Sequence, residues 1–311
     1  MKDTDRYYSL NKFLRKKFHQ RVHKLSIDAG FSCPNKENGK SGCIFCNSTS
    51  FSPGSKFSHL SVTEQLDEEI KRVSRRFHVD KFLAYFQPNT NTYADSSTLY
   101  RLYEEALKHP KVVGLVIGTR PDCVGDEVLD VIKEVSSLYP DKWVELELGL
   151  QSIDNNILNW MRRDHSLEDF TDACSRIKRY GFSTGVHIIW GTPFDIKNED
   201  LIIKTASFLS QIGIFSVKIH NLYVPTHTVL ADMYLNNMME IYSKKDYIDT
   251  VILFLEHLSS DIVVERLVSD VPADCLLAPL WLTNKNEIME EIIDELEKQD
   301  SYQGKRCSQT C

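Results

Sequence analysis

The sequence predicts an α/β fold in which six parallel strands form an open, partial (βα)6 barrel of the TIM-like kind, with helices outside. The first observation is that strand-like and helix-like stretches alternate six times before residue 221, a pattern typical of parallel strands joined by helices. The second is that residues 112–118 read VVGLVIG, an apolar run typical of a strand covered on both faces. Six such units suit an open barrel better than a closed eight-stranded one.

Short-range patterns locate the individual elements. The six expected strands cover residues 21–28, 81–87, 112–118, 143–150, 183–190 and 215–220. Thr63 and Asp95 are expected to cap helices, because their side-chain oxygens can accept hydrogen bonds from free backbone N–H groups. After Thr63, apolar residues recur at spacings of three and four, which indicates an amphipathic helix. The expected helices cover residues 64–77, a stretch beginning after Asp95, 126–138, 154–161, 167–180 and 199–212.

Beyond residue 225 the regular alternation ends. The elements expected there are helices around 229–242, at 245–258 and at 285–299, and a short strand at 261–268. The chain therefore divides into a basic N-terminal segment (1–24), the barrel (25–225), a C-terminal α/β extension (226–300) and a tail (301–311). We expect the extension to close one side of the barrel. The tail has no apolar periodicity and is expected to be disordered.

Composition limits the class of protein. Hydrophobic residues make up 42% of the 311 residues and charged residues 26%, as in ordinary folded soluble proteins. No run of about 18 apolar residues is present, so no membrane association is expected. The N-terminal residues have no apolar signal-peptide core, and eight cysteines without an export signal indicate thiols or metal ligands rather than disulfides. These features predict a cytoplasmic protein.

Basic residues are concentrated near the N-terminus. The net charge is −7, which argues mildly against a protein that coats nucleic acid nonspecifically. Nevertheless, six lysines and arginines fall within thirteen residues: Lys12, Arg15, Lys16, Lys17, Arg21 and Lys24. Such a patch can contact phosphate groups even on an acidic protein. The alternative is a basic helix that is simply solvated.

A loop with three cysteines follows the first expected strand. Between Phe31 and Asn47 the cysteines Cys33, Cys43 and Cys46 are spaced C-x9-C-x2-C, among proline, glycine and small polar residues typical of a loop. A loop can bring three thiolates to one point, and thiolates are ligands of iron–sulfur clusters and zinc. With three cysteines, a four-iron cluster would keep one iron open to a small molecule. The alternative is a zinc site completed by His19, His23 or His59.

The other five cysteines do not form such a group. Cys123, Cys174 and Cys275 are isolated in the sequence and are expected to be core or surface thiols. Cys307 and Cys311 lie in the tail, and two ligands are too few for a second cluster.

Polar residues gather where the expected strands end, which is the face that carries active sites in barrels of parallel strands. The candidates in chain order are Gln87, Asn89, Thr90, Asn91, Thr119, Arg120, Gln151, His187, Lys218, His220 and Tyr223. Arg120 could meet a carboxylate or phosphate of a ligand, or pair with a neighbouring acid. Glu145 and Glu147 share one face of the fourth strand, and inside a barrel two carboxylates must be paired or hydrogen-bonded.

The cysteine loop, with Phe45 before its last cysteine, resembles the radical S-adenosylmethionine (radical SAM) superfamily, and its long first gap resembles the Elongator catalytic subunit. Residues 118–122, GTRPD, resemble the Glu-Thr-Arg-Pro-Asp motif of that subunit, with glycine in place of glutamate. Residues 149–152, GLQS, are similar to a Gly-Val-Gln-Ser motif of the Elongator and coproporphyrinogen-type branches, and Arg163 follows at the matching distance. The turn after the second strand lacks the usual Gly-Gly-Glu. The resemblance spans about residues 20–300 and is closest to the YtqA/MnmL branch, with the similar YhcC proteins.

This resemblance implies a 4Fe–4S cluster on Cys33, Cys43 and Cys46, which reductively cleaves S-adenosylmethionine (SAM) to a 5′-deoxyadenosyl radical. In the related branches the residues matching Gln151 and Arg163 contact SAM, the arginine through the SAM carboxylate. The full set of residues that the resemblance implies for cofactor binding is Gln87, Asn89, Thr119, Glu147, Gln151, Arg163 and His187. The candidates for contact with the substrate are His187, Lys218, His220 and Tyr223, with Arg266 and Lys285 as weaker ones.

The implied reaction is tRNA modification, the conversion of carboxymethylaminomethyl-uridine to aminomethyl-uridine at the wobble position. The implied partners are tRNA, an electron donor such as flavodoxin or ferredoxin, and a functionally linked tRNA methyltransferase. One alternative is a radical SAM enzyme acting on a small molecule such as a tetrapyrrole precursor. The other is a non-catalytic zinc or iron–sulfur module, which would give Gln151 and Arg163 no role.

Overall fold

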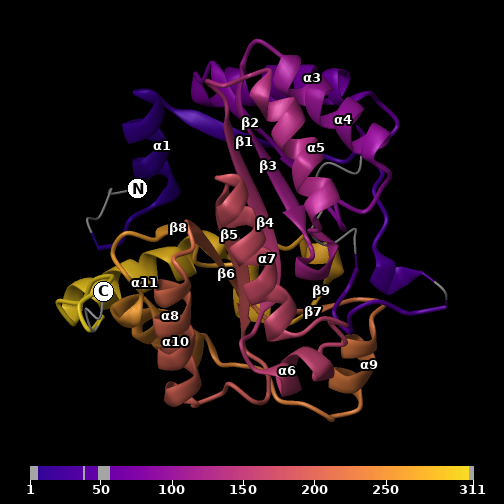
Figure 1. Ribbon diagram of the computed structural model, residues 1–311. Coiled ribbons are helices and arrows are strands. Elements are labelled where there is room, and N and C mark those ends of the chain that lie inside the picture. Colours follow the sequence, from indigo (N-terminus) through magenta and orange to yellow (C-terminus); the bar gives the residue numbers. More distant parts are fainter. Residues whose placement is uncertain (1–5, 38, 48–56, 308–311) are drawn as a thin grey trace.

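The structure is a computed structural model that describes residues 6–37, 39–47 and 57–307 (Figure 1). Its main feature is one sheet of parallel strands, curled into a partial barrel in the order β1-β2-β3-β4-β5-β6-β8. The strands are β1 (Val22–Ile27), β2 (Lys81–Phe86), β3 (Val112–Thr119), β4 (Trp143–Gln151), β5 (Ser183–Trp190), β6 (Ser216–Asn221) and β8 (Val263–Arg266). The six strands expected from the sequence are confirmed, with ends shifted by no more than about a residue. Because all run in parallel, their carboxyl ends meet at one end of the barrel.

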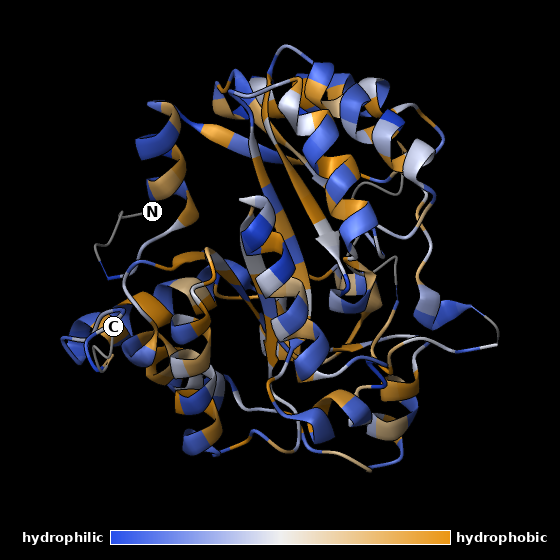
Figure 2. Ribbon diagram, viewed as in Figure 1, coloured by the Kyte–Doolittle hydropathy of each residue, from blue (hydrophilic) through white to orange (hydrophobic). Residues whose placement is uncertain are grey.

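Helices cover the outside of the sheet (Figure 1). Those of the barrel are α3 (Val62–Phe77), α4 (Ser96–Lys108), α5 (Asp126–Ser137), α6 (Asn155–Trp160), α7 (Leu167–Tyr180) and α8 (Glu199–Ile212). Figure 2 shows helices that alternate between hydrophilic and hydrophobic residues around strands that are largely hydrophobic, as expected for one buried helix face. The cap of α3 differs from the expectation. Ser61 rather than Thr63 begins the helix, because Ser61 and Glu64 cap each other's backbone N–H groups.

The extension contributes a strand to the barrel. It comprises α9 (Val229–Leu235), α10 (Lys244–His257), α11 (Lys285–Lys298), β8, and the short antiparallel pair β7 (Val224–Pro225) and β9 (Leu276–Ala278). β8 pairs in parallel with β6 as the seventh strand, so the sheet is one strand wider than the expected six. The helix expected over 229–242 ends at Leu235, and Asn237 adopts the left-handed backbone conformation typical of a helix end.

The basic N-terminal segment forms a helix that closes the amino end of the barrel. Helix α1 (Leu10–Phe18) buries Leu14 against residues of the first strands. The Phe13 ring lies 5.6 Å from the Trp143 ring and 4.7 Å from the Phe215 ring, at the amino ends of β4 and β6. The basic side chains of α1 are exposed on its other face. This segment is therefore part of the barrel's core as well as a charged surface.

The tail is ordered as far as residue 307, so the expectation of disorder is wrong for this part. Ser301 is fully buried and its hydroxyl donates to Glu256 Oε1 at 2.6 Å. The Gln303 amide donates to the carbonyls of Ser259 and Ile262, and its oxygen accepts from the Tyr8 N–H. These bonds tie the tail to the extension and to the N-terminal segment, which is why it does not behave as a free polar peptide. Cys311 lies outside the described residues.

In the described part of the chain, none of the helices has both the length and the apolar character that crossing a membrane requires.

Candidate functional site

The loops that follow β1, β2 and β4 meet at the carboxyl end of the barrel. The Asn35 amide, in the cysteine loop, donates to the Arg162 carbonyl at 2.7 Å. The Ile44 N–H donates to the Met161 carbonyl at 3.1 Å, and the Thr90 N–H to the Ser32 carbonyl at 3.1 Å. The three loops therefore form one surface around the cysteines.

Donors and cations surround the three thiols. Cys43 is 8% exposed, and its sulfur accepts from the Arg163 guanidinium at 3.2 Å and from the Asn35 amide at 3.4 Å. Burial raises the pKa of the Cys46 thiol; the Lys36 ammonium opposes that rise, and the neighbouring thiols Cys43 and Cys33 add to it. Three converging sulfurs with cationic neighbours suit an anionic thiolate-bound cluster.

The histidines that a zinc site would need lie elsewhere. His19 ends α1 at the amino end of the barrel. His23 is the second residue of β1, and its ring stacks on Phe77 of α3 at 4.8 Å. His59 is exposed. The three histidines named as possible zinc ligands therefore do not join the cysteines of this loop.

Gln151 and Arg163 lie side by side, in agreement with the resemblance, which implies that both contact one ligand. A Cβ atom on Gly149 would lie 2.8 Å from Gln151 Nε2 and 2.9 Å from Arg163 Nη2, so both side chains pack over this glycine. Gln151 has a φ of 74° and follows a register shift between β4 and β5, which turns its side chain out of the regular strand alternation. Both residues are less than 10% exposed. They form the wall of the site next to Cys43.

Neighbouring residues fix the position of Arg163. Its Nη2 donates to the Gly149 carbonyl at 2.8 Å and its Nε to His165 Nε2 at 3.3 Å. Burial and the Arg163 charge lower the pKa of His165 to about 4, so this imidazole is neutral and can accept. Arg120 donates to the Arg163 carbonyl at 2.8 Å and pairs with Asp122 at 2.9 Å. Arg120 is thus a structural residue, and His165 is a member of the site that no sequence motif indicated.

The turn after β2 contains two buried acceptors without partners. The Gln87 amide donates to the Ser26 hydroxyl at 2.6 Å, and Asn89 accepts from Lys36 Nζ at 3.2 Å, so both expected candidates are engaged within the protein. Thr90 and Asn91 are each 1% exposed. Their Oγ1 and Oδ1 atoms have no hydrogen-bond partner among the described residues. Leaving such atoms unpaired is costly, so they are suited to accept from a ligand.

A layer of charged side chains crosses the barrel interior below this surface. Glu147 of β4 lies at its centre, four residues or about 13 Å before Gln151 along the strand. Its Oε1 pairs with Lys24 Nζ at 2.6 Å, and its Oε2 with Lys218 Nζ at 2.6 Å and His187 Nε2 at 2.7 Å. The expectation that both carboxylates are paired holds fully for Glu147, whereas Glu145 Oε2 has no hydrogen-bond partner among the described residues and faces Lys24 at 3.7 Å. Glu147 and His187 therefore hold each other, rather than lying beside the cysteine loop.

The pKa values of the two glutamates of β4 are shifted in opposite directions. Burial alone would raise the pKa of Glu147, but Lys218 and Lys24 outweigh burial and hold it well below its ordinary value. Burial raises the pKa of Glu145 well above its ordinary value, and Lys24, 3.7 Å away, opposes this only in part.

The extension and the N-terminal segment each supply a residue to this layer. Glu265 of β8 pairs with Lys24 Nζ at 2.6 Å and accepts from the Ser216 hydroxyl at 2.9 Å. Lys24 had been counted with the surface patch, and that assignment is wrong because its side chain is only 14% exposed. The exposed patch therefore lies on α1 and at Arg21.

The remaining candidates lie on and after β6. The His220 ring lies 5.2 Å from the His187 ring, and its Nε2 is buried without a hydrogen-bond partner in the described chain. Lys218 is committed to Glu147 and to the Tyr85 hydroxyl at 3.3 Å. Tyr223 is partly buried between β6 and β7.

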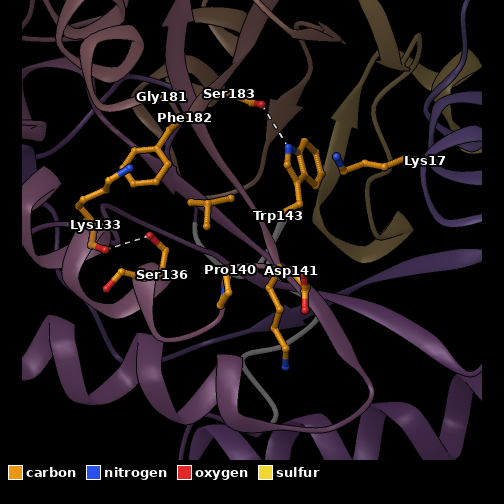
Figure 3. A pocket seen from close by; sticks show the side chains of 12 residues that line it. Lys17, Lys133, Ser136, Pro140, Asp141, Trp143, Gly181, Phe182 and Ser183 are labelled. Atoms are coloured by element: carbon orange, nitrogen blue, oxygen red, sulfur yellow. Dashed lines mark hydrogen bonds between the residues drawn. The ribbon is translucent and has the colours of Figure 1, made fainter.

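Two surface hollows lie at opposite ends of the barrel. One of about 320 Å³ is lined by Ser41, Cys43, Ile44, Cys46, His227, Thr228, Val229 and Asp232. The other, of about 450 Å³, lies where β4 and β5 begin; Figure 3 shows its lining, including the bond from Trp143 Nε1 to the Ser183 hydroxyl. The first adjoins the cysteine loop. The second is remote from it and is not part of the site.

Comparison with known proteins gives a consistent result. Residues 32–209 match the model of the radical SAM superfamily, and residues 214–298 match that of the Radical_SAM C-terminal domain. The chain is 32% identical over 306 residues to the uncharacterized protein YtqA of Bacillus subtilis, covering 96% of this chain and 92% of YtqA. It is 26% identical over 196 residues to a tRNA uridine(34) acetyltransferase of Methanocaldococcus infernus, covering 61% of this chain and 35% of that protein.

The fold is also that of a solved structure. The archaeal Methanocaldococcus infernus Elp3, with residues 1–46 deleted, superposes with a TM-score of 0.71 at 19% identity. The superposition covers 91% of this chain and 64% of that one.

Proposed function

Because this chain belongs to the radical SAM superfamily, we propose that it binds a 4Fe–4S cluster through Cys33, Cys43 and Cys46 and modifies the wobble uridine of tRNA. The observation that supports this proposal most is that Cys43 of the three-cysteine loop contacts Arg163, which lies beside Gln151 at one end of the barrel. When bound, the cluster supplies the electron that cleaves SAM to a 5′-deoxyadenosyl radical. An electron donor is needed for this, and flavodoxin or ferredoxin is the proposed one.

The chain's own residues bind and position the ligands. Arg163 offers a planar guanidinium to the SAM carboxylate, oriented by neutral His165, and Gln151 contacts SAM beside it. Thr90 Oγ1 and Asn91 Oδ1 are the free acceptors on the neighbouring loop, so we assign them, rather than Gln87 or Asn89, to the SAM ammonium group. Thr119 supports SAM binding indirectly. Its hydroxyl forms a hydrogen bond of 2.5 Å with the hydroxyl of Thr92, which fixes the turn that carries Thr90 and Asn91.

Closing the amino end of the barrel excludes water from the reaction. The α1 helix packs its apolar face there, and the charged layer around Glu147 fills the interior above it. A reactive radical requires such exclusion, while the cofactors carry the chemistry. Glu147 and His187 act in this proposal as supports of the site's floor.

The choice of tRNA rests on the relatives. One relative, matched over 196 residues at 26% identity, is a tRNA uridine(34) acetyltransferase, and uridine 34 is the wobble position. The resemblance to the YtqA/MnmL branch narrows the proposed reaction to conversion of carboxymethylaminomethyl-uridine into aminomethyl-uridine, before a tRNA methyltransferase acts. Arg15, Lys16 and Lys17 are exposed on α1 and are proposed to contact tRNA phosphates distant from the modified base.

Mass spectrometry of tRNA nucleosides tests the proposed function. Cells that lack the gene should accumulate carboxymethylaminomethyl-uridine and lose the nucleosides derived from aminomethyl-uridine. Reintroducing the wild-type gene should restore the pattern, whereas a gene encoding Cys43→Ser should not. Identical nucleoside profiles with and without the gene would refute the tRNA assignment.

Arg163→Lys should weaken SAM binding about thirtyfold, because lysine keeps the charge but loses the fork that matches a carboxylate, and such bonds are worth about 2 kcal/mol. Iron content should be unchanged. The matched control is Arg162→Lys, an exposed neighbour whose substitution should leave SAM affinity at the wild-type value. Equilibrium binding of SAM to the two reconstituted variants measures their affinities. Equal affinities for the two variants would remove Arg163 from the SAM site.

A further inference from the structure

Arg266, at the end of β8, is a half-buried cation without an anionic partner. Among the described residues, no carboxylate or hydrogen-bond acceptor lies within bonding distance of its guanidinium. Its neighbour Glu265 is engaged by Lys24 and Ser216 instead. An arginine held among other protein groups usually has a partner, since an uncompensated charge away from water is costly.

A β-bulge brings Arg266 to the barrel interior. In the pairing of β6 with β8, Ser216 faces Val263, Val217 faces Val264, and Lys218 faces Arg266, so Glu265 is the extra residue. Successive residues of a regular strand point to opposite faces, but a bulge places two neighbours on the same face. Glu265 reaches Lys24 inside the barrel, and Arg266 occupies the position opposite the inward-facing Lys218. The bulge therefore adds a second charged residue of β8 to the interior.

Besides Glu265, which pairs with lysines, the titratable groups near Arg266 include a histidine and a lysine. His220 lies close enough that the Arg266 charge, after burial, lowers the pKa of its imidazole. Burial and Arg266 likewise lower the pKa of Lys285 on α11, whose ammonium contacts Asp270 at a long 3.5 Å. His220 Nε2 is buried and unpartnered in the described chain, and its Nδ1 lies 3.4 Å from the Ser269 hydroxyl. A guanidinium and a free imidazole nitrogen thus share one corner of the barrel.

The charged layer below does not neutralise Arg266. Two ammonium groups, Lys24 and Lys218, are matched there by two carboxylates, Glu147 and Glu265. The third carboxyl, Glu145, faces Lys24 at 3.7 Å, and burial raises its pKa well above the ordinary value. None of these three carboxyl groups forms an ion pair with Arg266 in the described chain. A counter-charge for Arg266 can therefore come from solvent ions or from a ligand.

We propose that Arg266, with His220 beside it, binds the carboxylate of the substrate's carboxymethylaminomethyl group. This inference rests on the proposed function and names the group of the substrate that the site recognises. A planar carboxylate matches the guanidinium fork. An RNA phosphate shares this chemistry, but Arg266 sits on a barrel strand, where a single base can enter more readily than the RNA backbone.

RNA binding by the cluster-loaded protein tests the proposal. Three anticodon stem-loops of one sequence are compared, with carboxymethylaminomethyl-uridine, aminomethyl-uridine or unmodified uridine at the wobble position. The wild type should bind the first at least about tenfold more tightly than the second, the range expected for bonds to a charged group. Arg266→Gln should abolish this preference without changing affinity for the other two RNAs. Arg101→Gln, an exposed arginine on α4, is the matched control and should keep the preference.

The possible outcomes separate the sources of the anion. If Arg266→Gln weakens the binding of all three RNAs equally, the arginine contacts a phosphate and the carboxylate assignment is wrong. If it changes the affinity for none of the three, the proposal is wrong altogether. Because Arg266 has no partner within the described chain and an uncompensated charge is costly, its loss should not lower the unfolding midpoint, and Arg266→Lys should retain part of the preference.

A second measurement is independent of RNA. Phenylglyoxal modifies arginines, and peptide mass spectrometry reports its reaction with Arg266. Glycinate should protect Arg266, whereas glycinamide, which lacks the carboxylate, should not. If glycinate protects Arg266 but loss of the gene has no effect on cellular tRNA, the anion site is supported and the proposed function is refuted. Suppose instead that the protein modifies cellular tRNA, but glycinate does not protect Arg266 and the purified protein does not distinguish the three RNAs. That result would support the proposed function and refute the carboxylate site at Arg266.

Discussion

Replacing Cys43 by serine should remove the iron–sulfur cluster. Cys43 is the most buried of the three loop cysteines, and its sulfur accepts from both Arg163 and Asn35. With one ligand lost, two thiolates remain, and the serine oxygen is a harder donor that suits iron–sulfur clusters less well. After anaerobic reconstitution, iron and sulfide content and the visible absorption of the cluster should fall close to background. Reductive cleavage of SAM should be lost with them.

Cysteines outside the loop provide the matched controls. Cys275→Ser and Cys307→Ser change partly exposed thiols on the extension and the tail, and each should retain the iron of the wild type. Loss of about half the iron in Cys307→Ser would instead indicate a second cluster. Purification of the wild type with stoichiometric zinc and no iron under strict anaerobiosis would contradict the cluster assignment itself.

Glu147→Gln should destabilise the fold by about 3–5 kcal/mol, the typical cost of removing one partner from a buried ion pair. The substitution keeps the shape of the side chain but removes the charge that faces Lys24, Lys218 and His187. Lys218 would then keep Glu265 at 3.5 Å, and Lys24 would keep Glu265 at 2.6 Å and Glu145 at 3.7 Å. Urea unfolding of the full chain measures the change as a shift of the midpoint.

Glu145→Gln is the control, because it makes the same chemical change two residues away on the same strand. Burial raises the pKa of Glu145 well above its ordinary value, so the substitution should remove less charge than Glu147→Gln does, and glutamine can still hydrogen-bond Ser216. The expected loss is about 1 kcal/mol or less, the worth of a neutral hydrogen bond. Equal destabilisation by the two variants would show that shape and not charge governs the layer.

The stabilisation by Glu147 also depends on pH. Its folded-state pKa lies below the value of about 4.3 expected in the unfolded chain, so acidification protonates the unfolded state first. Its contribution is complete above the unfolded pKa and is lost as the pH falls through the folded one. The difference in stability between wild type and Glu147→Gln should therefore be constant near neutral pH and shrink below about pH 5.

Much of the fold could be predicted from the sequence because its signals are local. The apolar run at 112–118 and the alternation of strands with amphipathic helices fixed the parallel topology. Parallel topology in turn places every residue that follows a strand at the same end of the barrel, so the cysteine loop was correctly located. The pairing of Gln151 with Arg163 was also predictable, because both lie on one strand–loop–helix unit of fixed length.

The charged layer was decided by the tertiary structure. Lys24 looked like one of six surface cations in a basic segment, yet it pairs with Glu147 and Glu265, which lie 123 and 241 residues away. These groups meet only because the sheet curls, which brings its edge strands β1 and β8 near each other. The tail shows the same limit, since Ser301 and Gln303 are buried by partners that have no sequence pattern in common with them.

The sequence by itself determined the six alternating strand–helix units and placed the three-cysteine loop, Gln151 and Arg163 after strands at the carboxyl end of the barrel. The tertiary structure alone decided which polar residues remain free to meet a ligand. The sequence gives no reason to prefer one of the four polar residues Gln87, Asn89, Thr90 and Asn91. In the structure Gln87 bonds Ser26 and Asn89 bonds Lys36. Thr90 and Asn91 each have a buried oxygen without a hydrogen-bond partner among the described residues. Likewise a single bulge turns Arg266 inward. The physical reason is that strand and helix periods are properties of neighbouring residues, whereas hydrogen-bond saturation depends on which distant side chains the packed barrel brings within about 3 Å.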